Sequence, residues 1–76
     1  MARAHVTLEI FGFGGGGGGS LTVERALAHV PGVVHAYVNP ATETAYVEYE
    51  TTRVEPDALV DAVERVGFRS GIPVLR

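Results

Sequence analysis

Three stretches of the chain alternate apolar with polar residues, the pattern of a β-strand with one buried face. They span His5–Phe11, Val33–Asn39 and Thr44–Glu50. The turn between the second and third stretches is short and begins at Pro40, which predicts an antiparallel hairpin. In the second stretch, the side expected to face the core carries Val34, Ala36 and Val38.

Two other stretches have apolar residues three and four positions apart, which is the period of a helix. The first begins at Ser20, a candidate N-cap for which Gly19 is the alternative, and is ended by Pro31-Gly32. The second begins at Pro56, because a proline N–H is not needed in a first turn, and ends before Gly67.

A last, short strand is predicted over Phe68–Leu75. It is interrupted by Gly71 and Pro73. Because proline cannot donate a backbone hydrogen bond to a neighbouring strand, Pro73 predicts that this strand lies at an edge of the sheet.

The order β-α-β-β-α-β predicts an α+β, ferredoxin-like sandwich, in which two helices cover one face of a four-stranded antiparallel sheet. The 76 residues are expected to form one domain, 1–76. The predicted core combines Val6, Leu8, Ile10, Ala26, Leu27, Ala36, Val38, Val47, Leu59 and Val63. The other sheet face would carry Thr7, Glu9, Tyr37, Tyr46 and Glu48, a mixture polar enough to meet water.

Six consecutive glycines, Gly14–Gly19, separate the first strand from the first helix. We expect Gly14–Gly19 to be the most mobile internal segment, since glycine has the most backbone freedom to lose on ordering. The run offers no thiolate, imidazole or carboxylate. It matches Gly-x-Gly-x-x-Gly as any polyglycine does, but the next strands form a hairpin rather than a parallel unit, and no Gly-Lys-Ser/Thr ending follows.

The composition of the chain argues against several classes of function. The net charge is −3 and all six cations are Arg, so no basic patch for nucleic acid is expected. Cysteine is absent, which excludes disulfides and thiolate metal sites in the chain as written. No apolar run approaches roughly 18 residues, so we expect no membrane segment here and a cytoplasmic location, or the soluble tip of a larger protein.

The remaining polar residues give weak site candidates. His5, His29 and His35 form no His-x-His or His-x3-His pair, and solvated surface positions explain them best. Glu48 and Glu50, with Glu9 across the sheet, could gather a hard cation, but a solvated strand face is the simpler interpretation. No Ser/His/Asp constellation appears, so we expect no enzyme activity.

Several segments are similar to one known family. They are Pro31-Gly32-Val33, Ala36-x-Val38-Asn39, Ala41-Thr42-Glu43-x-Ala45-x-Val47-x-Tyr49, Val23–Leu27 and Val63–Phe68. Together they resemble a heavy-metal-associated domain, the family of copper metallochaperones, mercury-binding proteins and N-terminal modules of metal-pumping P-type ATPases. The resemblance covers roughly residues 6–70 and is most specific in its central segment.

The resemblance implies a Gly-Met-x-Cys-x-x-Cys loop between the first strand and the first helix. Placing Gly12-Phe13 on the Gly-Met pair puts the two cysteine positions at Gly15 and Gly18, the register we prefer. Counting back from the first helix gives Gly16 and Gly19 instead. Phe13 and Phe68 are implied to pack beside the loop. Two thiolates would chelate a soft ion such as Cu(I), whereas glycine offers only weakly donating carbonyls.

The resemblance therefore implies a module that binds and transfers copper(I) or another soft metal ion, in a form without its cysteine ligands. As written, the chain is expected not to bind Cu(I), Hg(II) or Zn(II) with useful affinity. A P-type ATPase or a chaperone is the implied partner. The alternative is a non-catalytic structural or regulatory interaction domain that docks on a partner or on a second copy of itself.

Overall fold

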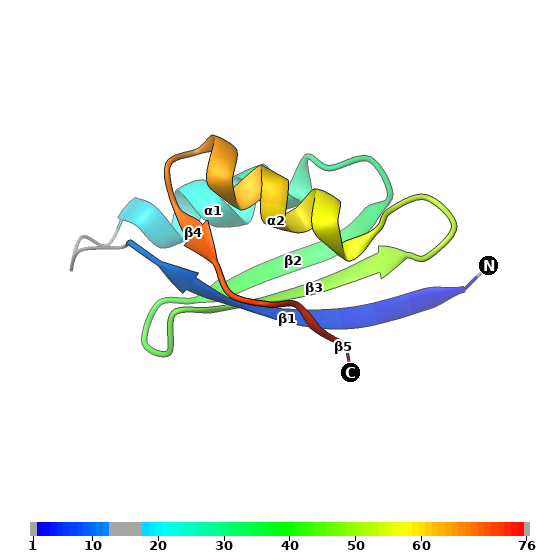
Figure 1. The fold of residues 1–76 in the computed structure, drawn as a ribbon, viewed down its shortest axis with the longest axis horizontal. Coiled ribbons are helices and arrows are strands. Elements are labelled where there is room, and N and C mark those ends of the chain that lie inside the picture. Colours follow the sequence, from blue (N-terminus) through cyan, green and yellow to red (C-terminus); the bar gives the residue numbers. More distant parts are fainter. Residues whose placement is uncertain (1, 13–17, 76) are drawn as a thin grey trace.

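The computed structural model describes residues 2–12 and 18–75, where two helices cover one face of an antiparallel sheet (Figure 1). Phe13, Gly15 and Gly16, named above, lie outside the described residues. The elements are β1 (Arg3–Phe11), α1 (Gly18–Ala28), β2 (Val33–Asn39), β3 (Thr44–Glu50), α2 (Pro56–Arg65), β4 (Arg69–Ser70) and β5 (Val74–Leu75). The ferredoxin-like fold predicted from the sequence is confirmed.

The sheet has the strand order β2-β3-β1-β4, and β5 also pairs with β1. All pairs are antiparallel, with Val47 of β3 opposite both Val6 of β1 and Ala36 of β2. The predicted interruption of the last strand is confirmed, because β4 and β5 are separate two-residue strands on the same side of β1. Between them the N–H of Gly71 donates to the carbonyl of Glu9 at 2.8 Å.

The core lies between the sheet and the helices. Most of the predicted core is buried. Ala26 and Ala36 are half-buried, and Ala36 packs against the core cluster. Four more buried residues complete it: Val23, Ala45, Tyr49 and Val54. Val54 belongs to the connector before α2, which the hydrophobic period did not mark. Its N–H donates to the carbonyl of Glu50 at 3.1 Å, which holds this connector against the end of β3.

Two predicted details of the strands are wrong. Val34 was expected to face the core, but its side chain is 43% exposed. The cause is a register shift between Val33 and His35, where β2 has one residue more than β3 and the alternation changes sides. In addition, β1 begins at Arg3 rather than His5, because Ala4 pairs with the buried Tyr49 and packs against the core.

The start of the first helix also differs from the expectation. α1 begins at Gly18, so neither Ser20 nor Gly19 is its N-cap and both lie inside its first turn. Once the amphipathic part of a helix packs on the core, each added residue gains one hydrogen bond, and the helix continues past positions without strong propensity. The predicted ends of α2 are confirmed, with Pro56 as its first residue and Gly67 beyond its end at φ +92°.

Candidate functional site

The glycine run joins the end of β1 to the start of α1. Gly12, which follows β1, has φ +106°. A Cβ on Gly12 would lie 3.6 Å from Cδ1 of Phe68, so this ring borders the beginning of the loop. Gly18 and Gly19 are the first two residues of α1. Either register of the implied ligand pair therefore places its second position in the first turn of α1.

Phe68 reaches this place because of how α2 ends. The N–H of Gly67 donates to the carbonyl of Glu64 at 3.0 Å, and the N–H of Phe68 donates to that of Val63 at 3.3 Å. These bonds and the positive φ of Gly67 turn the chain back toward the sheet. Phe68 is half-buried and packs against the core cluster. Its packing against the metal loop itself stays a prediction, because residues 13–17 lie outside the described part of the chain.

The electrostatics at this end of α1 suit an anion. The first backbone N–H groups of a helix have no partner within the helix, and the helix dipole is positive there. The first turn of α1 contains no acidic side chain. A cysteine placed there would have a lowered thiol pKa, because the helix dipole stabilises the thiolate. The thiolate is the form that binds metal. Gly18 and Gly19 begin this turn, and its described residues supply no thiolate.

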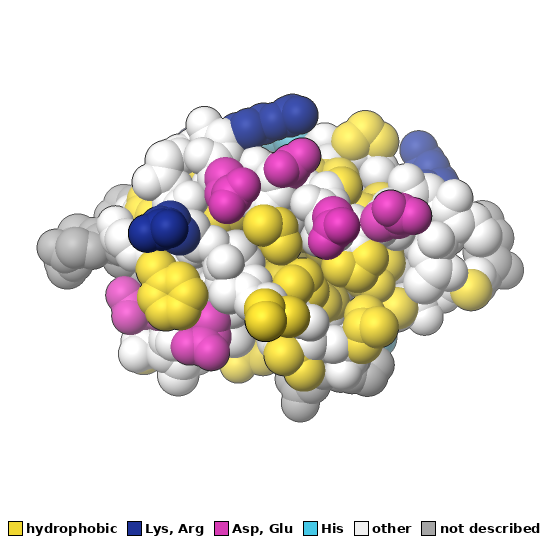
Figure 2. Space-filling view, viewed as in Figure 1, with side chains coloured by type: hydrophobic (Ala, Val, Ile, Leu, Met, Phe, Trp, Pro, Cys, Tyr) yellow, Lys and Arg dark blue, Asp and Glu magenta, His cyan; other side chains and the backbone are white. Residues whose placement is uncertain are grey.

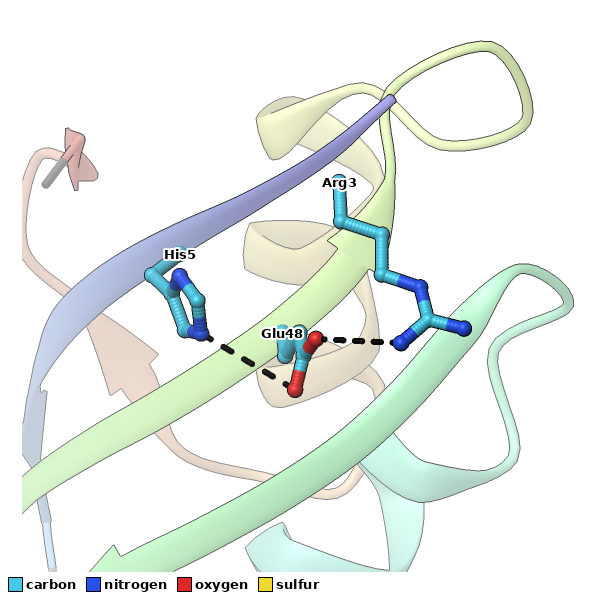
Figure 3. A network of polar contacts seen from close by, with 3 residues as sticks. All are labelled: Arg3, His5 and Glu48. Atoms are coloured by element: carbon cyan, nitrogen blue, oxygen red, sulfur yellow. Dashed lines mark hydrogen bonds and ion pairs between the residues drawn. The ribbon is translucent and has the colours of Figure 1, made fainter. Parts of the chain in front are cut away.

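Apart from the loop, a cluster of polar side chains lies on the open face of the sheet, away from the helices (Figure 3). The carboxylate of Glu48 lies between two cationic or potentially cationic groups: Arg3 Nη1 is 3.5 Å from Oε2, and His5 Nε2 is 3.8 Å from Oε1. His35 pairs with Glu48 from the other side, on β2. A hollow of about 350 Å³ is lined by His5, Val6, His35, Tyr46, Val47 and Glu48.

Sequence reasoning treated these histidines as scattered. His5 and His35 are thirty positions apart, and only the strand order β2-β3-β1 places one on each side of Glu48. The alternating pattern does indicate that His5, His35 and Glu48 face outward. Only the order of the strands shows that these three residues are neighbours. Among the described residues, no group of three or more His, Asp or Glu is placed so that it could hold a metal ion. Glu9 lies at the other end of β1 and pairs with Thr44 rather than with a carboxylate.

A third surface is apolar. Phe11, Ile72, Val74 and Leu75 are each at least half exposed, with Ile72 at 88%. All four lie along the edge where β4 and β5 pair with β1. Figure 2 shows hydrophobic side chains gathered along this side of the molecule, with acidic side chains above them. Within the described ranges, no helix is long and apolar enough to cross a membrane.

Comparison with known proteins points to one family. The model of the heavy-metal-associated domain family matches residues 17–69. The probable copper-transporting ATPase PacS of Synechocystis is 49% identical over 53 residues, which are 67% of this chain and 7% of the ATPase. The chain thus spans a small fraction of the length of this relative.

Solved structures agree. The N-terminal domain of PacS from Synechocystis is 39% identical and has a TM-score of 0.77, with 88% of this chain and 92% of that domain covered. The Cu(I)-loaded N-terminal domain of a potential copper-translocating P-type ATPase from Bacillus subtilis is 25% identical and has a TM-score of 0.88. That likeness covers 99% of this chain and 92% of the other.

Proposed function

The chain belongs to the heavy-metal-associated domain family, and from that premise we propose that residues 1–76 are one copper-type metal-binding and transfer module whose thiolate ligands are replaced by glycine. It is a binding module and not an enzyme, in keeping with the family and with the metallochaperone among its structural neighbours. As written, the loop does not hold Cu(I).

The observation that carries the proposal is the intact frame around the glycine run. β1 ends at Phe11, α1 begins at Gly18, and Phe68 borders Gly12 at the start of the loop. The chain contains no cysteine. Cu(I) is soft and prefers thiolates, whereas the backbone carbonyls of glycine suit hard cations. The described elements on both sides of the glycine run therefore support a metal loop that lacks its thiolate ligands.

The test restores the ligands in both registers. Gly15→Cys with Gly18→Cys is one variant, and Gly16→Cys with Gly19→Cys is the other. Each is titrated with Cu(I) under anaerobic conditions against a competing chelator, beside the parent chain. An intact mass of each protein is recorded first, so that the number of thiols is known.

A control variant carries the same number of thiols elsewhere. Thr42→Cys with Thr52→Cys places them in the turns beyond the two ends of β3, which has seven residues. At a rise of about 3.3 Å per residue, such a strand holds its ends roughly 20 Å apart, too far for one ion to bridge. Both positions are exposed, so the fold should be unaffected.

We expect the Gly15/Gly18 variant to bind one Cu(I) per chain, more tightly than the control, and the parent to bind none. The proposal is wrong if neither loop variant binds more tightly than the control, or if the parent binds as tightly as the variants. The proposed partner is a metal-transporting P-type ATPase or a chaperone in the cytoplasm, because the relatives matched include copper-transporting ATPases and a metallochaperone.

The second candidate is a structural or regulatory interaction domain. The exposed apolar edge formed by Phe11, Ile72, Val74 and Leu75 favours it, since contiguous apolar surface of this kind can mark a contact surface. Sedimentation equilibrium of the parent and of Ile72→Ser with Leu75→Ser tests self-association. A parent that stays monomeric at all concentrations excludes a second copy as the partner.

A further inference from the structure

We propose that the apolar edge formed by Phe11, Ile72, Val74 and Leu75 binds a cationic, apolar segment of a partner protein, which lies along β5 in an extended conformation. This rests on the second candidate function and deepens it by naming the chemistry of the partner. It is independent of the metal loop. The proposal is carried by the uncovered apolar side chains of this edge, by the free side of β5 and by the charges around both.

At β5 the helix-covered side of the sheet reaches beyond its cover. Leu75 lies opposite Val6 in the ladder between β5 and β1, so the two side chains are on the same side of the sheet. Val6 is 1% exposed within the core, whereas Leu75 is 63% exposed. Burial of an apolar side chain is favourable because it removes the side chain from water. An apolar group of a partner that packs on Leu75 would therefore extend the core.

The strand itself has a free side. β5 pairs with β1, and in the part of the chain that the structure describes no strand lies on its other side. Val74 is opposite Thr7, so it is on the open face of the sheet, while Leu75 is on the helix side. An extended segment laid beside β5 would thus find an apolar contact on each face. Strand addition of this kind is a common way for an exposed sheet edge to bind a peptide.

A carboxylate borders this edge on the open face. The N–H of Gly71, the residue before Ile72, donates to the carbonyl of Glu9 at 2.8 Å. A Cβ on Gly71 would lie 3.4 Å from Cβ of Glu9 and 3.6 Å from Cε2 of Phe11. Glu9 is exposed, so its charge stands beside the apolar side chains of the edge.

On the helix side, α2 brings two more carboxylates. Ala58 and Ala62 line a hollow of about 410 Å³ between α2 and α1, which marks the flank of α2 that faces α1. Asp57, Val60 and Glu64 are spaced by three and four residues and lie on the other flank, on the side of β4, which α2 contacts. Figure 2 shows acidic side chains in this place, next to the apolar ones.

The balance of charge selects the partner. Arg69, opposite Phe11 on β4, is a cation at one end of the edge. Three carboxylates and one guanidinium leave the surroundings of the edge negative, in a chain whose net charge is −3. A segment with Lys or Arg beside its apolar residues complements this pattern. A second copy of the chain would instead bring the same carboxylates together without enough cations to pair them.

The test uses three short synthetic peptides with a fluorescent label, in which Val alternates with Lys, Val with Glu, or Ser with Lys. Each is titrated with the whole chain, and binding is followed by fluorescence anisotropy at low salt and at about 1 M salt, where the Debye length is only about 3 Å. We expect the Val-Lys peptide to bind one per chain. It should bind at least about tenfold more tightly than the other two, which lack either the cations or the apolar groups.

Two serine variants test the apolar contacts. Ile72→Ser with Leu75→Ser should weaken binding of the Val-Lys peptide by at least about tenfold, because both side chains would be buried by the peptide. Leu21→Ser with Val34→Ser is the matched control, since these exposed apolar residues are on α1 and β2, outside the edge. The control should leave the affinity unchanged. Thermal midpoints show whether each variant is folded.

Two further variants test the charges. Glu9→Gln with Glu64→Gln should weaken binding by about three- to tenfold at low salt and have little effect at about 1 M salt, because exposed charges are screened. Glu48→Gln with Asp61→Asn removes the same number of charges elsewhere: Glu48 is in the middle of the open face, and Asp61 lines the hollow between the helices. This control should change the affinity by less than about twofold.

NMR of the parent locates the peptide without any substitution. On addition of the Val-Lys peptide, the backbone amide signals of residues 69–75 should shift, while those of β2 should not. The proposal is overturned if the Val-Lys peptide does not bind below millimolar concentration, if the Val-Glu peptide binds as tightly, or if the shifts fall on β2. It is also overturned if the Ile72/Leu75 variant folds and binds like the parent.

Sedimentation equilibrium separates this proposal from the second candidate function. A parent that dimerises, with a dimer that is lost in Ile72→Ser with Leu75→Ser, would keep the interaction domain but make a second copy its partner, and would overturn the proposal. A monomeric parent that binds the Val-Lys peptide supports it. The Cu(I) titration of the loop variants has no bearing on either outcome, since it concerns another ligand and another part of the chain.

Discussion

The carboxylate of Glu24 on α1 accepts a hydrogen bond of 3.0 Å from the backbone N–H of Val38 on β2. β2 is an edge strand, with β3 as its only strand neighbour in the described part of the chain. The side chain of the first helix therefore satisfies a donor at the sheet edge. Unpaired donors at such edges favour pairing with other chains, and this contact removes one of them.

Glu24→Ala should lower the free energy of unfolding by about 1–3 kcal/mol, since it leaves a partly buried backbone donor without its partner. Denaturant unfolding followed by circular dichroism measures the change. Glu64→Ala is the control, because Glu64 is exposed on α2 and the same substitution there should cost less than about 0.5 kcal/mol. Equal losses in the two variants would show that the contact with Val38 does not contribute.

Val47 tests the position of the core. Its side chain is 1% exposed, and it lies opposite Val6 and Ala36 in the middle of the sheet. Val47→Asp should unfold the domain, because it buries a charge without a partner. Tyr37→Asp, at a position 48% exposed on the outer face, should only lower the thermal midpoint. A Val47→Asp protein with the thermal midpoint of the parent would contradict the assignment of the core.

The sequence predicted the fold because its periodicities agree in every long element. Hydrophobic alternation located β2 and β3 to the residue, and Pro56 and Gly67 marked the limits of α2. Hydrophobic periodicity did not predict the details that depend on how one strand pairs with its neighbour. The register shift that exposes Val34 and the placing of Val54 in the core follow from contacts with β3, which a single stretch of sequence does not contain.

The candidate sites also differ in how far the sequence alone could locate them. Phe68 was placed beside the loop by resemblance, and the structure puts its ring next to Gly12. The row His5–Glu48–His35 was not predicted, since its members come from three strands and become neighbours only through the strand order. The ligand positions Gly15 and Gly18, and the alternative Gly16 and Gly19, stay predictions that the cysteine variants test.

Two glycines with similar positive φ angles differ in their surroundings. Gly32 has φ +97° and Gly67 has φ +92°, both in the region that side chains disfavour. A Cβ on Gly32 would overlap Cγ2 of Val54 and lie 2.8 Å from Cβ of Arg53. A Cβ on Gly67 would have no neighbour within 4 Å. The pair therefore separates backbone strain from steric conflict.

Gly67→Ala should lower the free energy of unfolding by about 1–2 kcal/mol, the cost of a non-glycine residue at positive φ. Gly32→Ala should cost more, by roughly a further 1–3 kcal/mol, because the new methyl group must displace buried Val54 and the backbone-linked Cβ of Arg53. The N–H of Glu50 donates to the carbonyl of Gly32 at 2.9 Å, so a shift there also strains the end of β3. Denaturant unfolding of both variants measures the difference. Equal losses would mean that the connector before α2 moves aside freely, and that Val54 contributes less to the core than its burial indicates.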